Sequence, residues 1–476
     1  MSTHVASRRR AILFLFLILI SSCFIFAAAG KLPLIDWDEA TYASIARDTL
    51  RTGNWFVLTH FGVPWFEKPP LYIWITMGSI MAFGTSEFAL RLPSAVLSII
   101  AVLLLYLLVL ELCDDAWLAF ISGLALLYLS PFYLFGTQSR MDVPVVAAIL
   151  FSVFCFIKGQ RDKRWLAGVG VGIGIGILIK SIIGLLALAP IFSYSIVYRK
   201  WNWLSNKFLW IGFGIGFLLL LPWHLYDTLG YGWQFWHEYL VVQVVTRGAT
   251  DMRGMSTLDY FRYLWSACLP WSFVAAIVPW FLLIRRKSET ALREWRAVIF
   301  ALMSFLLLFL FFALARTKMS AYLVPLMPFL AIFAVVGLSY ILQRVLFTPK
   351  TGQVVFLGAC IVLLTVGAGF VLREEFINLP RYYYPYVFDE KTIGDYLAAK
   401  GEGLPLFVYR WDAMESMEFY SGEQASAVAA LPNPQSGPFY LATISNYLDT
   451  LYHEDGAYKP SDEIYVGSTL SLLKVP

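Results

Sequence analysis

Long apolar runs constrain the fold of this chain more than any other feature of its sequence. A helix of about 20 residues crosses the roughly 30 Å hydrocarbon core of a bilayer. Eleven runs of about this length lie at residues 11–30, 92–112, 116–136, 143–158, 165–180, 182–198, 207–226, 261–284, 297–315, 320–343 and 353–372. Only 14% of the 476 residues are charged, against about 25% in soluble domains. The sequence therefore predicts a mainly α-helical, polytopic membrane protein with about eleven transmembrane helices, and it excludes an ordinary soluble enzyme.

The basic residues predict which loops face the cytoplasm. The first run follows Arg8–Arg10, and short basic loops lie at residues 158–164, 199–207, 285–296 and 344–350. Cytoplasmic loops carry this excess of Lys and Arg. The first run is long enough to span, which favours a retained helix over a cleaved signal peptide. Residues 31–68 and those after 373 then lie outside. Because a further crossing at 69–83 would break the alternation, we expect that shorter run at the interface or re-entrant.

A charged and aromatic stretch separates the first two long runs. Its charges are Asp36, Asp38, Glu39, Glu67 and Lys68. Charges close to the hydrocarbon are costly and are a functional hypothesis by default. Positions 42, 45, 46, 49 and 50 share one helical face, which predicts a short helix along the membrane surface. We expect this helix to stop at Gly53, with Asp38 at or just before its first turn.

The composition changes after residue 372. Residues 373–476 contain turn-forming clusters, helical stretches near 391–400 and 444–453, and strand-like runs at 406–411, 439–443 and 463–466. This pattern predicts a small α/β domain on the outer face. The predicted domains are therefore a membrane domain, 1–372, which includes an outer loop with juxtamembrane helices at 31–91, and a C-terminal α/β domain, 373–476.

Two motifs in the first outer loop suggest chemistry. Asp38, followed by Glu39, is either a helix N-cap or a general base, which needs a carboxylate close to an apolar cavity and a substrate proton. The sequence Glu67-Lys68-Pro69-Pro70 fixes a charged pair at the entry to an apolar segment. Lys68 is either a phosphate ligand or a lysine that extends to the lipid headgroups.

Further charged and polar residues are predicted on the same outer face. These are Arg140, Asp142, Lys180, Arg247, Lys318 and Tyr322. Alternatively, Arg140 and Asp142 only pair with each other, and Lys180 extends to the lipid headgroups. Basic residues there oppose the positive-inside bias, so we expect an anionic partner. A lipid-linked phosphate fits better than a nucleotide, because the sequence has no glycine-rich phosphate loop.

Several of these residues recur in order in a known family. Asp38-Glu39, Gly53-x-Trp55, Phe66-Glu67-Lys68-Pro69 and Lys318-x-x-x-Tyr322 resemble the polyprenyl-phosphate-sugar-dependent membrane glycosyltransferases. The chain is most similar to their aminoarabinose (lipid A) transferase branch, which is related to the protein O-mannosyltransferases. The resemblance covers residues 11 to about 345 and implies the family's membrane fold and an inverting sugar transfer.

The resemblance also implies residue roles. Asp38 is similar to the family's catalytic carboxylate, and Lys68, with Arg247 and Tyr322, is similar to the residues that hold the lipid phosphate. Glu67 resembles a carboxylate that can coordinate a divalent metal.

The chain departs from the aminoarabinose branch at three points. It has Gln243-Val244 in place of Glu-His, Thr41 in place of an arginine before Tyr42, and a much shorter C-terminal part. The metal requirement and the sugar therefore stay open, and so does the acceptor.

Together these observations predict a glycosyltransferase of the bacterial inner membrane whose active site faces the periplasm. It would move a sugar from a polyprenyl (undecaprenyl) monophosphate to a lipid, glycan or protein acceptor. The catalytic candidates are Asp38, as general base, and Glu39. The candidates for substrate or phosphate binding are Lys68, Arg247, Tyr322, Tyr42, Lys318, Asp142 and Arg140, and Glu67 is the metal candidate. Two alternatives are a lipid-linked sugar transporter or flippase without chemistry and, within the enzyme class, a protein O-mannosyltransferase. A transporter favours internal repeats and midplane polar residues, and neither is evident here.

Overall fold

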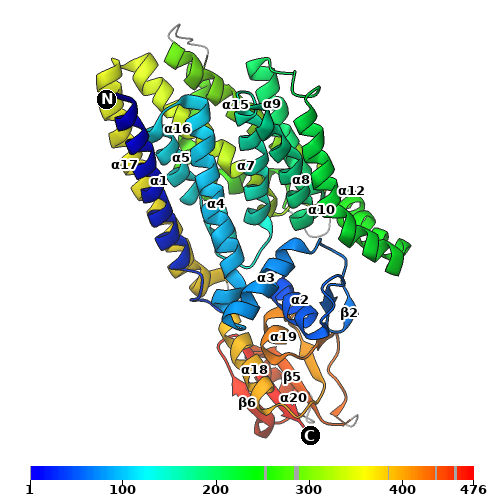
Figure 1. Cartoon of the computed structure of the whole chain (residues 1–476). Helices are drawn as coiled ribbons and strands as arrows, with labels where there is room; N and C mark the ends of the chain where they lie inside the picture. Colours follow the sequence, from blue (N-terminus) through cyan, green and yellow to red (C-terminus); the bar gives the residue numbers. More distant parts are fainter. Residues whose placement is uncertain (1, 251–254, 283–288, 384, 435–436, 455–457) are drawn as a thin grey trace. The chain divides into compact units, whose positions relative to one another are not determined.

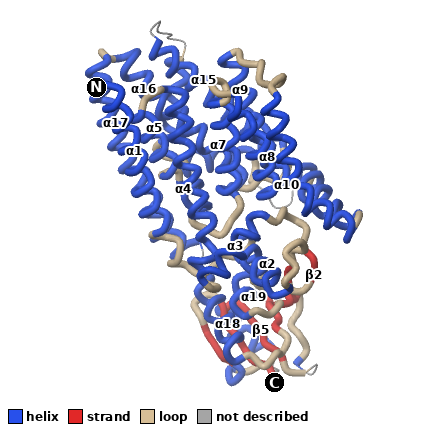
Figure 2. The backbone as a smooth tube through the Cα atoms, viewed as in Figure 1, coloured by secondary structure: helices blue, strands red, loops and turns tan. Residues whose placement is uncertain are grey.

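The computed structural model describes residues 2–250, 255–282, 289–383, 385–434, 437–454 and 458–476 (Figure 1). The first residues of the predicted basic loop 285–296 lie outside the described residues. The described backbone is mainly helical, and its strands are confined to residues 59–64 and 406–475 (Figure 2). Contacts divide the chain into two compact units. The first is Met1–Ala28, Phe66–Ile75 and Leu92–Arg373, and the second is Ala29–Trp65, Thr76–Arg91 and Glu374–Pro476.

Long apolar helices build most of the first unit. Its α-helices are α1 (Ser2–Phe26), α4 (Glu87–Cys113, whose first residues belong to the second unit), α5 (Ala116–Leu127), α6 (Ser130–Gly136), α7 (Asp142–Lys158), α8 (Ala167–Lys180), α9 (Leu188–Tyr198), α10 (Lys207–Tyr231), α11 (Trp233–Trp236), α12 (Arg247–Ala249), α13 (Thr257–Ala267), α14 (Trp271–Phe281), α15 (Glu289–Leu314), α16 (Met327–Tyr340) and α17 (Pro349–Arg373). Shorter 3₁₀ and π segments adjoin them at η1 (Lys163–Leu166), η2 (Ser181–Ala187), η3 (His237–Thr246), η4 (Ser320–Leu326) and η5 (Ile341–Leu346).

The predicted mainly helical membrane fold is confirmed, and the count of eleven spans is not. Among the described residues, seven helices are long and apolar enough to cross a membrane, or nine if each of two bent pairs counts as one span. The predicted run 261–284 is one such pair, α13 and α14, bent by 102°. The runs 165–180 and 182–198 fall in one apolar helical segment, Lys163–Tyr198. Helix α7 has only 17 residues.

Glycines let α8 approach its neighbours closely. A Cβ added to Gly212 of α10 would clash with the Ala167 carbonyl oxygen of α8, so a side chain there is excluded. At the other end of α8, a Cβ on Gly176 would lie 2.9 Å from the Cα of Gly184. Eight residues of continuous helix would span about 12 Å, so the chain folds back between these glycines. The break falls at Ser181, where φ is 50°. The small-residue pattern thus builds close helix packing.

A five-stranded mixed sheet forms the core of the second unit. Its order is β4 (Ala425–Val428), β3 (Leu406–Tyr409), β5 (Phe439–Ile444), β7 (Leu470–Val475) and β6 (Glu463–Val466). Strand β3 is parallel to both β4 and β5, whereas β7 is antiparallel to β5 and β6. Alternate side chains of a strand point to opposite faces. Tyr440 accordingly packs with α18 (Val387–Lys400) and α19 (Glu415–Ser421), and Leu441 packs with α20 (Leu448–Glu454). The predicted α/β character of this region is confirmed.

The predicted surface helix is α2 (Asp38–Thr52), which packs against α19. It ends at Gly53, whose φ of 73° is left-handed and whose N–H donates to the Thr49 carbonyl. This matches the stop predicted from the sequence. The predicted interfacial run is the 13-residue helix α3 (Leu71–Phe83), and a short hairpin, β1 (Thr59–His60) with β2 (Val63–Pro64), precedes it.

Most of the first predicted outer loop and the C-terminal α/β region share the second unit, whereas residues 66–75 belong to the first. The π segment η6 (Glu374–Tyr383) opens the C-terminal part of the second unit, and the 3₁₀ turns η8 (Ser445–Tyr447) and η9 (Pro460–Asp462) lie further along the chain. The predicted division at residues 372 and 373 stays a prediction.

Candidate functional site

A buried aromatic cluster in the first unit fixes the backbone that carries Glu67 and Lys68. Phe66 is fully buried, with its ring centroid 4.8 Å from Tyr231 and 5.7 Å from Phe235. Trp223 and Tyr239 complete the cluster. Two prolines follow Lys68 and restrict the chain on its other side. The cluster and the prolines therefore position the charged pair from both directions.

Gln243 joins Glu67 to Lys68. The Lys68 ammonium donates to the Gln243 side-chain oxygen at 2.7 Å, and the Gln243 side-chain nitrogen donates to Glu67 Oε2 at 2.8 Å. Lysine can only donate and a carboxylate only accept, so this amide orientation alone satisfies both. Arg247, four residues after Gln243, lies 3.7 Å from the same carboxylate oxygen. All four side chains are half-buried, so they remain open to a ligand.

Backbone hydrogen bonds hold the Arg247 segment beside that of Lys318. The N–H of Arg316 donates to the Gly248 carbonyl at 3.1 Å, and that of Thr317 donates to the Arg247 carbonyl at 3.3 Å. The Lys318 ammonium donates to the Ala315 carbonyl at 2.6 Å. Arg247 and Lys318, predicted separately, are therefore carried by adjoining segments of the first unit.

A second charged group in the first unit surrounds Asp142, the first residue of α7. Lys180 donates to its Oδ1 at 2.5 Å and Arg140 to its Oδ2 at 3.1 Å. The predicted pair is thus a trio in which Lys180 takes part. Asp142 and Lys180 also line a small cavity with Tyr322, whose ring stacks on Phe312 at a centroid distance of 5.7 Å.

Tyr72 of α3 connects the loop that carries Arg140 to the helix that follows Lys68, which is α3 itself. Its hydroxyl lies 2.7 Å from Ser94 Oγ and 3.2 Å from Ser139 Oγ, and Ser94 donates to the Arg140 carbonyl at 2.8 Å. Since Tyr72 comes four residues after Lys68, these bonds fix the Arg140 backbone relative to the start of α3.

In the second unit, Asp38 is the first residue of α2, and the N-cap is Trp37, which makes no side-chain capping bond. The alternative that Asp38 is an N-cap is therefore wrong. Trp37 has φ 68° and ψ −130°, a conformation that costs a non-glycine residue about 1–3 kcal/mol and clusters at functional sites. Asp38 is half-buried, and its Oδ1 accepts a 3.3 Å hydrogen bond from the hydroxyl of buried Tyr42. Tyr42 thus orients the candidate base.

Glu39 lies beside Asp38 in a different environment. It is fully buried and bidentate to Arg91, with Nε to Oε1 at 2.8 Å and Nη2 to Oε2 at 2.9 Å. The Ile35 N–H also donates to it, and Arg91 donates to the carbonyls of Leu32 and Pro33. This network fixes the start of α2 to the preceding loop, so the geometry favours a positioning role for Glu39.

Asp36 faces the carboxyl group of Glu390 of α18. Burial is the main cause that raises the pKa of Asp36 to about 6, and burial together with the charge of Asp36 raises the pKa of Glu390. Asp36 accepts a 2.7 Å hydrogen bond from the Ser416 N–H, and Glu390 accepts one from the Trp411 indole. The loop before Asp38 is therefore held by carboxyl groups that resist ionisation.

The residues around Glu67 do not fit a divalent metal. One of its two carboxylate oxygens, Oε2, already accepts from the Gln243 amide, and the nearby Arg247 guanidinium would repel a cation. The described part of the chain holds no group of three or more His, Cys, Asp or Glu arranged for a metal.

The structure thus places the predicted residues in three groups. Glu67, Lys68 and Arg247 share one group, with Lys318 on an adjoining segment, and Arg140, Asp142 and Tyr322 share another. Asp38, Glu39 and Tyr42 lie together in the second unit. Sequence reasoning missed Arg91 as a partner of Glu39 and noted Gln243 only as a departure. Each is a polar residue within or next to an apolar run, which is the signal that identifies them.

Comparisons with known proteins confirm the resemblance. A family model described as dolichyl-phosphate-mannose-protein mannosyltransferase matches residues 67–226. Two curated relatives named undecaprenyl phosphate-alpha-4-amino-4-deoxy-L-arabinose arabinosyl transferase 2 are similar to the chain. The protein from Proteus mirabilis is 28% identical and covers 62% of the chain, and that from Sodalis glossinidius is 29% identical and covers 60%. The chain spans 53% and 52% of their lengths.

A solved structure is similar over nearly the whole chain. It is the crystal structure of ArnT from Cupriavidus metallidurans bound to undecaprenyl phosphate, with a TM-score of 0.74, 17% identity and 98% coverage of each chain. At that identity the match shows a shared membrane fold. The chain is an integral membrane protein with this fold.

Proposed function

We propose that this protein is a glycosyltransferase that moves a sugar from a polyprenyl (undecaprenyl) monophosphate to a lipid, glycan or protein acceptor. We place the reaction on the outer, periplasmic face of the bacterial inner membrane. The arrangement that carries the proposal is the half-buried group of Lys68, Gln243, Glu67 and Arg247. Its cations are held by an amide oxygen at 2.7 Å and by a carboxylate at 3.7 Å. A phosphate would offer Lys68 an anionic oxygen in place of the neutral amide oxygen, and it would bond directly to Arg247, from which Glu67 lies beyond hydrogen-bond distance.

The transfer assigns one task to each group. The acceptor oxygen or nitrogen attacks the anomeric carbon and loses its proton to Asp38, while the bond from that carbon to the phosphate oxygen breaks. Polyprenyl phosphate leaves, and Lys68 and Arg247 stabilise the charge that develops on it. The names of the curated relatives support a sugar carried by undecaprenyl phosphate. An inverting outcome follows from the family resemblance. Because Glu67 does not fit a metal, no step depends on one.

The test uses purified full-length protein in liposomes that contain a panel of labelled polyprenyl-phosphate sugars, with and without candidate acceptors. General base catalysis contributes about 10²–10⁴-fold to a rate. Asp38→Asn should therefore lower turnover by about that factor while donor binding stays unchanged. The control is Asp449→Asn, which changes an exposed carboxylate of α20 in the same unit.

Three outcomes contradict the proposal. Equal loss of turnover and donor binding in Asp38→Asn would remove the general-base role. Donor movement across the bilayer without release of polyprenyl phosphate would favour the transporter. A product of retained anomeric configuration would contradict the inverting transfer.

A further inference from the structure

Helix α13 meets α14 at a sharp bend in the first unit. The directions of the two helices differ by 102°, and residues 268–270 separate them. Helix α13 has its own N-terminal cap, because the Ser256 hydroxyl accepts a hydrogen bond from the Asp259 N–H at 3.1 Å. The two helices are therefore separate elements with separate directions, although the apolar run 261–284 is continuous in the sequence.

Contacts with α16 fix the direction of α14. Just before α14, Cys268 Sγ lies 3.6 Å from Met327 Sδ. Ten residues further along both segments, a Cβ added to Gly337 would lie 2.7 Å from the Val278 side chain. Ten residues of helix cover about 15 Å, so α14 runs alongside α16 in the same direction. The segment Ser320–Leu346, which contains α16, is long and apolar enough to cross a membrane. Helix α14 thus follows the direction of crossing, and α13 lies close to the membrane plane.

Helix α13 buries one face and exposes a second, apolar one. Tyr260 and Leu264 are buried against the protein. Leu258, Phe261 and Trp265 are 57%, 53% and 48% exposed, and their spacing of three and four residues places them on one stripe of the helix. Contiguous exposed apolar side chains mark a surface that contacts another protein or a membrane. This stripe therefore needs a neighbour.

A polar face lies next to the apolar stripe. Asp259, Arg262 and Ser266 each follow a residue of the stripe by one position, which is about 100° around the helix. The Arg262 side chain is 70% exposed and lies 3.3 Å from Asp259. Helix α13 thus presents one face to the protein, one to an apolar medium and one to water. A helix that lies in a membrane interface has this division between apolar and charged faces.

The apolar stripe lies near the end of a long apolar helix. The Phe261 ring centroid is 4.9 Å from that of Phe309 in α15. Helix α15 ends five residues later, at Leu314, and Arg316 begins the charged segment that follows. Five residues correspond to about 8 Å along the helix. Interfacial helices bury their apolar face about 5–10 Å into the boundary between headgroups and acyl chains, so the depth of the stripe agrees with that position.

Hydrogen bonds join α13 to the segment that carries Lys318. The Tyr260 hydroxyl donates to the Met319 carbonyl at 2.8 Å. The N–H of Met255, just before the helix, donates to the Lys318 carbonyl at 2.8 Å. The same segment holds the backbone of Arg247. Helix α13 is therefore linked to two of the cations that are candidates for phosphate binding.

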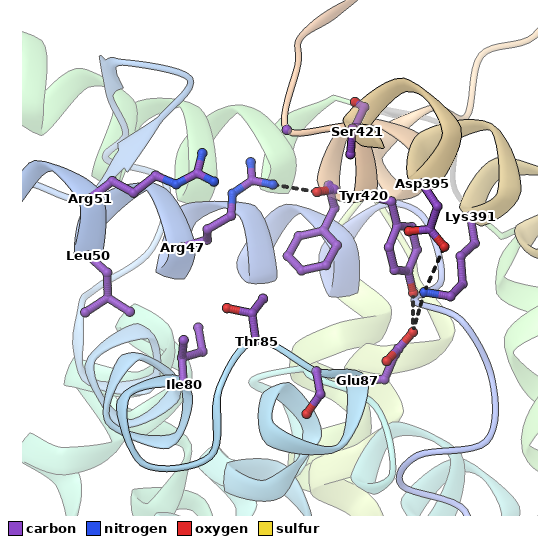
Figure 3. A pocket seen from close by; sticks show the side chains of 14 residues that line it. Arg47, Leu50, Arg51, Ile80, Thr85, Glu87, Lys391, Asp395, Tyr420 and Ser421 are labelled. Atoms are coloured by element: carbon purple, nitrogen blue, oxygen red, sulfur yellow. Dashed lines mark hydrogen bonds and ion pairs between the residues drawn. The ribbon is translucent and has the colours of Figure 1, made fainter. Parts of the chain in front are cut away.

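A cavity of about 680 Å³ in the second unit differs from this surface, because its charged groups are matched (Figure 3). Lys391 lies 3.1 Å from Glu87 and 3.5 Å from Asp395, as the dashed lines in Figure 3 mark. Arg47 pairs with Asp48 at 2.9 Å. The lining of the cavity therefore satisfies its own charges, whereas the apolar stripe of α13 stays exposed in the protein.

We propose that α13 is an interfacial helix that binds the bilayer surface and holds the Lys318 segment at the depth of the lipid headgroups. The stripe of Leu258, Phe261 and Trp265 contacts acyl chains next to the headgroups, and Arg262 contacts lipid phosphates. The occupant is lipid because the adjoining α14 follows a helix that crosses the membrane. The lipid contact does not depend on catalysis. The link to the donor rests on the proposed function, since the carrier phosphate then arrives at the level of the cations that receive it.

The test measures the depth of single side chains in the full-length protein in phospholipid nanodiscs. Nitroxide labels are placed on single cysteines introduced at positions 258, 261, 262, 265 and 266, all of which are exposed. The background is Cys23→Ser, because Cys23 is exposed and the other four cysteines are buried. The relaxation of each label reports its contact with oxygen, which concentrates in lipid, or with a water-soluble nickel chelate.

We expect labels at 258, 261 and 265 to favour oxygen and those at 262 and 266 to favour the nickel chelate. The two faces should differ in depth by about 5 Å or more, since a helix is about 10 Å across. A steady increase in depth from 258 to 266 would show the first half of a bent span and overturn the interfacial position. Preference for the chelate at all five positions would place the stripe outside the bilayer and overturn the lipid contact.

The link to the donor is tested separately through Tyr260, as a positioning residue. Tyr260→Phe removes its hydrogen bond to the Met319 carbonyl, and we expect the donor KM to rise by about 2–10-fold with kcat unchanged. The control is Ser266→Ala, whose hydroxyl donates to the Arg262 carbonyl of the same helix and which should keep the KM of the unaltered protein. An unchanged KM in Tyr260→Phe would overturn the link. Absence of transfer by the unaltered protein would count against the proposed function alone, because the label depths decide the membrane contact without it.

Discussion

Two ion pairs next to the candidate residues differ in how firmly they are held. In the second unit, Arg91 and Glu39 meet at 2.8 Å with side chains 3% and 0% exposed. In the first unit, Arg247 and Glu67 are 3.7 Å apart with side chains 32% and 42% exposed. The Arg91–Glu39 pair is held tightly and shielded from solvent, whereas the Arg247–Glu67 pair is held loosely and is partly exposed to solvent. A fixed pair suits the positioning of a base, whereas a loose pair can exchange its carboxylate for a ligand phosphate.

The largest effect is expected from breaking the fixed pair. Arg91→Met leaves Glu39 buried without its cation, which typically costs about 3–5 kcal/mol. We expect the melting temperature of the detergent-solubilised protein to fall by many degrees, measured by scanning fluorimetry. Adding Glu39→Gln to Arg91→Met removes the uncompensated charge and should recover part of the loss. An unchanged melting temperature in Arg91→Met would show that the pair is not structural.

The half-buried group of Lys68, Gln243, Glu67 and Arg247, called the loose group, should affect donor binding and leave the stability of the protein nearly unchanged. Lys68→Ala removes one charged donor, and hydrogen bonds to charged groups contribute about 1.5–3 kcal/mol. We expect donor affinity to fall by roughly 10–150-fold, with the melting temperature nearly unchanged. Lys207→Ala, which removes an exposed lysine at the start of α10, is the control. A large drop in melting temperature for Lys68→Ala would show that the group around Lys68 stabilises the fold as the Arg91–Glu39 pair does, and would contradict the comparison.

The sequence predicted the fold where physical constraints are local. Apolar runs predicted the helices, and Gly53 predicted the end of α2, because the left-handed cap requires a residue without a Cβ. The fold-back at Ser181 matches the predicted boundary between the runs 165–180 and 182–198. The sequence did not predict the bend between α13 and α14, since an apolar run does not show where its helix changes direction. It also missed the bond from Arg91 to Glu39, which are 52 residues apart. Such pairing depends on tertiary packing, so a charge in an apolar run predicts a partner without identifying it.

The buried carboxyl groups of the second unit predict that the stability of the protein depends on pH. The pKa of Asp36 is raised to about 6, mainly by burial, and burial also raises the pKa of Glu390. A raised pKa means that the folded state binds the proton more tightly than the unfolded state. The stabilisation is therefore complete below about pH 4 and is lost as the pH rises through about 6.

We expect the melting temperature to fall as the pH rises from 5 to 7.5. Asp36→Asn removes one titrating group and should make this decline shallower. The control Asp449→Asn, which changes an exposed carboxylate of α20, should keep the slope of the unaltered protein. The same slope in Asp36→Asn and the unaltered protein would rule out Asp36 as the source of the pH dependence.

The smallest effect is expected from removal of metal ions. Gln243 donates to Glu67 and accepts from Lys68, so the amide already occupies the carboxylate that the family resemblance assigns to a metal. A chelator should therefore leave the initial rate of transfer unchanged. Gln243→Glu replaces the amide donor with a second carboxylate beside Glu67, and two carboxylates at this distance repel each other unless a cation joins them. We expect this variant to lose activity and to regain part of it in millimolar Mg²⁺. Chelator-sensitive transfer by the unaltered protein, restored by a divalent ion, would show that the loose group opens enough to exchange its amide for a metal as well as its carboxylate for a phosphate.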